Sequence, residues 1–163
     1  MKIPIHELNF NGSLLSRGFW LYVWEITASD GCHYYYVGRT GDSSTVNAQS
    51  PFSRLSQHLG MNPKSNALRR HLDRAGVNPE ACINFRLVSC GPLLAEAADE
   101  DTHRRSRDMV AAMEKALADA MAAAGYAMLN KVHCRKVLDE PLFDKVLAEF
   151  AEHFSKLRGR NTP

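Results

Sequence analysis

The chain has 163 residues, of which 45% are hydrophobic and 23% are charged, and its formal net charge is +2. This composition is typical of a globular protein with one main core, and it excludes disorder of the whole chain. The longest strongly apolar run, Phe19 to Trp24, is far shorter than the span of about 20 residues that crosses a membrane, and no apolar signal segment opens the chain. We therefore expect a cytoplasmic protein without membrane contact.

The first elements read clearly from the pattern of side chains. Residues 1–18 form an arm with little periodicity, whereas residues 19–27 are rich in aromatic and β-branched residues and predict a strand. Residues 29–31, Ser-Asp-Gly, indicate a tight turn. A second strand over 33–37 then runs antiparallel to the first, so we predict a β-hairpin.

The middle of the chain alternates between polar loops and short helices. Residues 39–49 are small and polar and predict a loop, and Ser50 before a proline is typical of a helix start, so a short helix is expected from Pro51 to about Leu59. A second helix fits 65–75. Residues 83–89 alternate between apolar and polar side chains, which predicts a third strand.

The last third of the chain is mainly helical. Residues 93–124 are alanine-rich, but 99–107 is polar on every side, so we expect a break there and a helix over 107–124. An amphipathic helix is predicted for 142–157. The order β-β-α-α-β-α-α indicates an α+β domain with a small three-stranded antiparallel sheet flanked by helices.

Cysteine and charge patterns add two expectations. The four cysteines form no CxxC pair and are expected to be reduced thiols; the alternative is a zinc site built from Cys32, His33, His133 and Cys134. Basic residues dominate 31–72, where Asp42 is the only acid, and acids cluster at 96–101. Such a division of charge fits a polyanionic partner, although solvated surface charge is the alternative.

Five polar residues are spaced as a site would be. The hairpin carries Tyr22 on one strand and Tyr36 on the next, and Gly38 marks a point where the strand turns sharply or admits a ligand. Arg54 and His58 are four residues apart and share one helix face. Taken singly, each of these side chains is more often a packing or surface residue.

Glu114 is out of place on its predicted helix. Its neighbours on the same face are Val110, Leu117 and Met121. Burying a lone carboxylate costs several kcal/mol unless a cation or hydrogen-bond donors meet it. Glu114 is therefore a candidate metal ligand, and the alternative is a residue at the edge of the apolar face that reaches solvent.

In this order the residues resemble the GIY-YIG endonuclease family. Trp20-Leu21-Tyr22 stands where the family has Gly-Ile-Tyr, and Tyr36-Val37-Gly38 stands where it has Tyr-Ile-Gly. Arg54-x-x-x-His58, Glu114 and a late Gly125-Tyr126…Asn130 element follow. The first motif departs from the family pattern because it keeps only the tyrosine.

The resemblance covers about residues 19–131 and implies a nuclease-like domain there, with an N-terminal arm at 1–18 and a C-terminal helical extension at 132–163. It implies hydrolysis of phosphodiester bonds in DNA with one divalent metal. Glu114 would hold Mg²⁺ or Mn²⁺, and Arg54 would grip the phosphate oxygens. The loop between Gly38 and Arg54 is longer than in the shortest members, which resembles restriction-type enzymes.

The resemblance also implies roles for the remaining site residues. Tyr22 would contact the attacking water, and either Tyr22 or His58 would accept its proton; the pKa of histidine near neutrality favours His58. Tyr36 would hydrogen-bond the site or the phosphate. Gly38 and Asn130 would support the site.

Nucleic-acid contacts and partners are expected from the basic residues. Candidate phosphate contacts are Arg39, Lys64, Arg69, Arg70, Lys131, Arg135 and Lys136. Asn47 and Gln49 carry side chains able to read a base edge. We expect DNA as substrate, with RNA as a second candidate, and a homodimer or a targeting protein as partner. The alternatives are an inactive nucleic-acid-binding module with the same fold, and a homing-type or repair-type nuclease.

Overall fold

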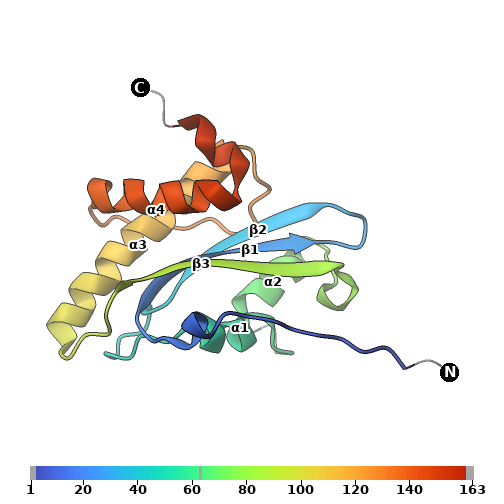
Figure 1. The fold of residues 1–163 in the computed structure, drawn as a ribbon, viewed down its shortest axis with the longest axis horizontal. Helices are drawn as coiled ribbons and strands as arrows, with labels where there is room; N and C mark the ends of the chain where they lie inside the picture. The colour runs from blue at the N-terminus through green and yellow to red at the C-terminus, as the bar shows by residue number, and fades with distance from the viewer. Residues whose placement is uncertain (1–2, 63, 161–163) are drawn as a thin grey trace.

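A computed structural model describes residues 3–62 and 64–160 and has an α+β architecture (Figure 1). Its three-stranded antiparallel sheet has the order β2-β1-β3. The strands are β1 (Phe19–Thr27), β2 (His33–Arg39) and β3 (Asn84–Leu94). The hairpin and the element order agree with the sequence prediction. The central strand is β1, so its side chains are covered on both faces of the sheet.

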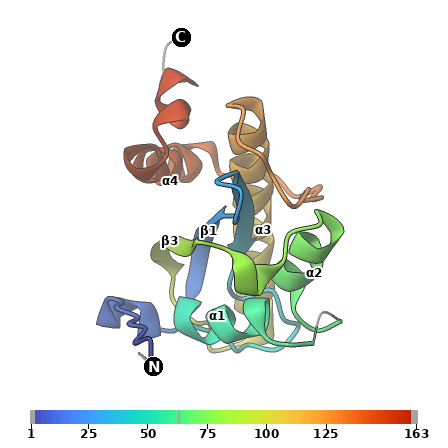
Figure 2. The same cartoon turned by 90° about the vertical axis from the view of Figure 1, so that its right-hand side faces the viewer.

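Four α-helices cover the sheet. They are α1 (Pro51–Leu59), α2 (Ala67–Arg74), α3 (Glu100–Ala123) and α4 (Glu140–His153). Helices α1 and α2 lie against one face, and α3 and α4 lie on the other, as the two views together show (Figures 1 and 2). Short 3₁₀ turns occupy Gly12–Leu15, Pro79–Ala81 and Ser155–Arg160.

The alternation of side chains along β1 divides the core into two parts. Odd-numbered residues such as Leu21 and Val23 pack toward α3 and α4, whereas Tyr22, Trp24 and Ile26 pack toward α1 and α2. The apolar face of α4 shares the larger core with α3 and the sheet. Tyr34 and Tyr36 lie on the α1 side and Tyr35 on the other, as their spacing predicts.

The structure corrects the helix predicted to begin at Arg107. Helix α3 is continuous from Glu100 for 24 residues, without a break at 99–107. Asp99 caps it by accepting a hydrogen bond from the backbone N–H of Thr102 at 2.8 Å, and His103 is buried in the first turns. A capped helix end needs few apolar side chains, which is why hydrophobic periodicity missed it.

Other boundaries differ by a few residues. Strand β3 extends to Leu94 and β2 to Arg39, both beyond their predicted ends. The last predicted helix, 142–157, is α4 followed by a 3₁₀ turn. Within the described ranges, no helix combines the length and the apolar character needed to cross a bilayer.

Candidate active site

The sheet register places two phenols around a glycine. Tyr22 pairs with Gly38 across the hairpin, and Tyr36 pairs with Trp24 on the same face. The ring of Tyr22 fills the space that a side chain at position 38 would need, because a Cβ there would lie 2.5 Å from Cε2 of that ring. Gly38 is therefore required for the position of the Tyr22 hydroxyl.

Helix α1 brings His58 to this phenol. Ser50 caps the helix by accepting from the N–H of Ser53, and Pro51 starts it, as the sequence predicts. His58 is only 3% exposed, and its Nε2 lies 2.5 Å from the hydroxyl of Tyr22. Its ring also meets the ring of Tyr36 edge-on, with centroids 5.2 Å apart. One imidazole thus contacts both phenols.

Burial sets the protonation states of this group. Burial is the main cause that raises the pKa of Tyr22 well above its ordinary value and raises the pKa of Tyr36 to about 12. Burial and the nearby charge of Arg54 lower the pKa of His58 from 6.5 to about 4. At neutral pH both phenols are protonated and the imidazole is neutral, so His58 is free to accept a proton.

Arg54 lies one helical turn before His58 and holds two side-chain acceptors. Its Nη2 donates to Oδ2 of Asp42 at 2.9 Å, and its Nη1 donates to Oε1 of Gln57 at 3.0 Å. Within the described residues its buried Nε has no partner. The positive charge of Arg54 also lowers the pKa of Tyr22, against the larger effect of burial. The guanidinium is therefore part of the same cluster.

Glu114 comes from α3, and a cation meets it there. Nε of Arg39 donates to Oε2 of Glu114 at 2.9 Å, and both side chains are 16% exposed. Burial raises the pKa of Glu114, whereas Arg39 and Arg54 oppose that rise. Arg39, predicted to contact phosphate, is therefore already occupied as the partner of Glu114, although its buried Nη1 has no partner in the described part of the chain.

Arg39, the last residue of β2, has contacts on both faces of the sheet. The hydroxyl oxygen of Tyr22 lies 3.3 Å from the carbonyl oxygen of Arg39, a second acceptor beside Nε2 of His58, while the side chain of Arg39 reaches Glu114 on the α3 side. The negative charge of Glu114 contributes to the raised pKa of both Tyr22 and Tyr36. The carboxylate thus acts electrostatically on both hairpin phenols, although among the described residues its hydrogen bond is to Arg39 and not to Tyr22, Tyr36, Arg54 or His58.

Glu114 offers one oxygen to a metal ion. Arg39 uses Oε2, and among the described residues no hydrogen bond ends on Oε1. In residues 3–62 and 64–160 no group of three or more His, Cys, Asp or Glu side chains is placed to hold a metal ion, and the four cysteines are free thiols. Mg²⁺ is often bound through one or two carboxylates with waters and substrate phosphates completing its shell. The donor set fits that mode of binding.

Asn130 braces the outer edge of β2. Its Oδ1 accepts from the N–H of Val37 at 3.1 Å, and its Nδ2 donates to the carbonyl of Val37 at 2.8 Å. The side-chain amide therefore pairs with the strand as another strand would. This contact fixes the backbone between Tyr36 and Gly38.

Comparison with family models, curated proteins and solved structures finds no match for this chain.

The predicted phosphate contacts occupy different settings. Arg69 donates to Glu80 at 2.7 Å and to the carbonyl of Leu59 at 3.2 Å, so it joins α2 to its surroundings rather than facing outward. Arg70 is half-buried, and Lys136 pairs with Asp108 at 2.8 Å. The exposed members of the set are Lys64, Lys131, Arg135 and Lys136.

Asp42 is the site residue that the sequence analysis did not select. Besides its contact with Arg54, its charge contributes to the raised pKa values of Tyr36 and Glu114. Its only signal in the sequence was its position as the sole acid in a basic segment. The loop that carries it also holds Asn47, whose Oδ1 accepts from Arg17 at 3.2 Å.

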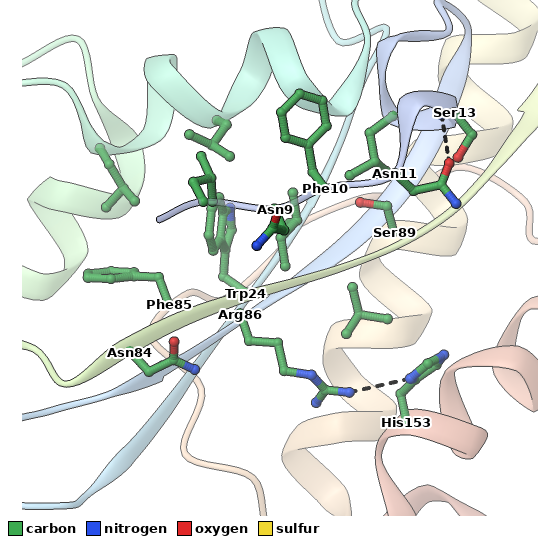
Figure 3. Close-up of a pocket in the computed structure, with 16 residues that line it drawn as sticks. Asn9, Phe10, Asn11, Ser13, Trp24, Asn84, Phe85, Arg86, Ser89 and His153 are labelled. Atoms are coloured by element: carbon green, nitrogen blue, oxygen red, sulfur yellow. Dashed lines mark hydrogen bonds between the residues drawn. The ribbon is translucent and has the colours of Figure 1, made fainter. Parts of the chain in front are cut away.

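A separate apolar cavity lies on the other side of α1. It has a volume of about 690 Å³ and is enclosed by the arm, β3 and the Leu55 and Leu59 side chains of α1. Figure 3 shows Phe10 and Asn9 of the arm beside Trp24 and Phe85. None of the five predicted site residues lines this cavity. We therefore place the candidate active site at the end of β2 and not in this cavity.

Proposed function

We propose that this chain is a divalent-metal-dependent endonuclease of the GIY-YIG type that hydrolyses phosphodiester bonds in DNA, in the restriction or defence class. One observation carries the proposal. The hydroxyl of Tyr22 is held 2.5 Å from a buried imidazole whose pKa is lowered to about 4, and Arg54 acts on both groups. A neutral base and a phenol can accept and relay the proton of the attacking water, and a guanidinium can stabilise the charge that develops on the phosphate.

Arg54 serves as the phosphate clamp in this proposal. Its guanidinium offers parallel N–H donors that match the non-bridging oxygens of a phosphate. Nη2 becomes available for such an oxygen when the phosphate displaces Asp42. The negative charge that develops on phosphorus-bound oxygens is stabilised by this fixed positive charge.

Proton transfer follows the contact between Tyr22 and His58. The attacking water gives its proton to the oxygen of Tyr22 while the phenol passes its own proton to Nε2 of His58. The phenol itself stays uncharged, which its raised pKa favours, and His58 leaves the step as an imidazolium. The bond from phosphorus to the leaving oxygen breaks, and that oxygen takes a proton from solvent.

Glu114 would hold Mg²⁺ or Mn²⁺ through its second oxygen. When bound, such an ion supplies Lewis-acid stabilisation of the phosphate oxygens. Arg39 orients the carboxylate through the bond to Oε2 and favours its ionised form against the larger effect of burial, which raises the pKa of Glu114. Tyr36 contacts the ring of His58 and limits the access of water to it.

Nicking of supercoiled plasmid DNA tests the proposal. Wild type is compared with Glu114→Gln and Arg54→Ala, and the exposed Glu149→Gln on α4 is the matched control. We expect metal-dependent nicking by wild type and by the control. Loss of the metal ligand or of the clamp should lower the rate by about 100-fold or more.

Three outcomes would contradict the proposal. Equal nicking by wild type, Glu114→Gln and Arg54→Ala would assign the activity to a contaminant. Retention of DNA by all variants without nicking would favour the inactive nucleic-acid-binding module. Cleavage confined to branched or nicked substrates would instead favour a repair-type nuclease.

A further inference from the structure

A polar groove follows the outer face of α1 beside the candidate active site. Its volume is about 610 Å³. The lining side chains come from α1, from the loop before it and from the arm, and all carry hydrogen-bonding groups: Arg17, Asn47, Gln49, Ser50, Ser53, Ser56 and Gln57. Such a lining is suited to a ligand that presents a dense array of donors and acceptors.

A hydrogen bond links a residue that lines the groove to a residue of the candidate active site. Gln57 lines the groove, and its Oε1 accepts from Nη1 of Arg54 at 3.0 Å. Arg54 is the residue assigned above to the scissile phosphate. A nucleic-acid strand whose phosphate lies on Arg54 would therefore place its neighbouring nucleotides against Gln57 and the groove.

The charges of the groove point to bases rather than phosphates. Arg17 is the only charged residue that lines it, and Arg17 is already paired with Glu96 at 2.6 Å. Phosphate contacts draw on Lys and Arg, whereas base edges are recognised by amides and hydroxyls. The remaining lining residues are amides and serines, which match base edges.

Helix α1 presents these groups in a form that duplex DNA accepts. Ser53 and Gln57 are exposed and one turn apart, and Ser56 is exposed beside them. An α-helix fits the major groove of B-DNA, whereas the corresponding groove of A-form RNA is too narrow. Because Oε1 of Gln57 is engaged by Arg54, its amide N–H groups remain to donate to base acceptors.

We propose that this groove reads the bases next to the cleaved phosphate of duplex DNA, with Gln57 and Gln49 as the residues that determine base preference. The proposal rests on the nuclease function proposed above. Guanine, adenine and thymine present acceptors in the major groove to which an amide donates. Gln49 is exposed at the end of the loop that precedes α1, and its side-chain amide offers both a hydrogen-bond donor and an acceptor.

Sequencing of the ends produced from a randomised duplex library tests this assignment. Gln57→Glu keeps the acceptor for Arg54 and removes the donor, and Gln49→Glu makes the same change in the loop. Asn84→Asp, exposed at the start of β3, adds the same charge outside the groove. We expect the wild-type preference for bases flanking the cut to change by about 5- to 100-fold in the two glutamine variants and to persist in the control.

The possible failures are distinguishable. If the wild type cuts and both glutamine variants give its end profile, the groove is not the reader and the nuclease function stands. An equal change in Asn84→Asp would assign the effect to charge alone and overturn the inference. If the wild type cuts no duplex in the library, both proposals are overturned. If the wild type cleaves an RNA duplex with the same base preference, the assignment to the DNA major groove is overturned.

Discussion

The hydroxyl of Tyr22 lies 2.5 Å from Nε2 of His58, and both side chains are almost completely buried. The phenol comes from the central strand and the imidazole from α1, so the contact also joins the sheet to that helix. In the described residues Nδ1 of His58 has no partner. The hydrogen bond with Tyr22 is therefore the only polar side-chain contact of the imidazole among the described residues.

Because the two residues act on one proton, their substitutions should not add. We expect Tyr22→Phe and His58→Asn each to lower the rate of DNA cleavage by about 10²- to 10⁴-fold. The double variant should cleave only slightly more slowly than the more impaired of the two single variants. Single-turnover rates with a labelled duplex measure this. Losses that multiply in the double variant would mean that the two residues act separately.

The low pKa of His58 links folding to pH. The unfolded chain takes up a proton at this residue below about 6.5, whereas the folded chain does so only near 4. Between these values the unfolded state binds more protons, so the free energy of unfolding falls as the pH is lowered from 6.5 to 4. The loss from this residue is roughly 3 kcal/mol, and urea unfolding at several pH values measures it.

His58→Asn is the control for that pH dependence. Glu114 acts with the opposite sign, because its raised pKa makes the folded chain the better proton acceptor at that residue. Subtracting the pH dependence of the free energy of unfolding of His58→Asn from that of wild type cancels the contributions of Glu114 and of all other groups that the two proteins share. Parallel curves for the two proteins from pH 7 to pH 4 would contradict the buried neutral state of His58.

The sheet and α1 could be predicted from local sequence, because each depends on short-range signals. Alternation marks the strands, and Ser50 with Pro51 marks the helix start. Glu114 was recognisable because a carboxylate on an apolar face is an anomaly. These features can be recognised in the sequence without knowing which helices and strands pack against each other.

The partners of the charged residues could not be predicted in the same way. Arg39 was expected to face phosphate, but it pairs with Glu114, 75 residues further along the chain. Asp42 was passed over because nothing local relates it to Arg54. Such contacts depend on how loops and helices pack in three dimensions, and no periodicity in the sequence records them.

Gly38 should resist substitution by even the smallest side chain. A Cβ at this position would lie 2.6 Å from both Cζ and the hydroxyl oxygen of Tyr22, so the phenol must move away from His58. We expect Gly38→Ala to lower the free energy of unfolding by about 1–3 kcal/mol and cleavage by about 100-fold or more. Gly12→Ala is the matched control, since a Cβ there meets nothing within 4 Å. Full activity of Gly38→Ala would show that the hydroxyl tolerates displacement.

In the proposed function Asp42 would compete with the phosphate for Arg54, so its removal should favour DNA binding. The carboxylate accepts from Nη2 of Arg54 at 2.9 Å and adds a negative charge where a phosphate is to sit. We expect Asp42→Asn to tighten binding of duplex DNA by about 3- to 10-fold at low salt, with a smaller gain at high salt. Fluorescence anisotropy in the presence of a chelator measures this without cleavage, and the exposed Asp144→Asn on α4 controls for net charge. Equal tightening in both variants would reduce the effect to overall charge, whereas weaker binding by Asp42→Asn would mean that the carboxylate positions Arg54 for the phosphate instead of competing with it.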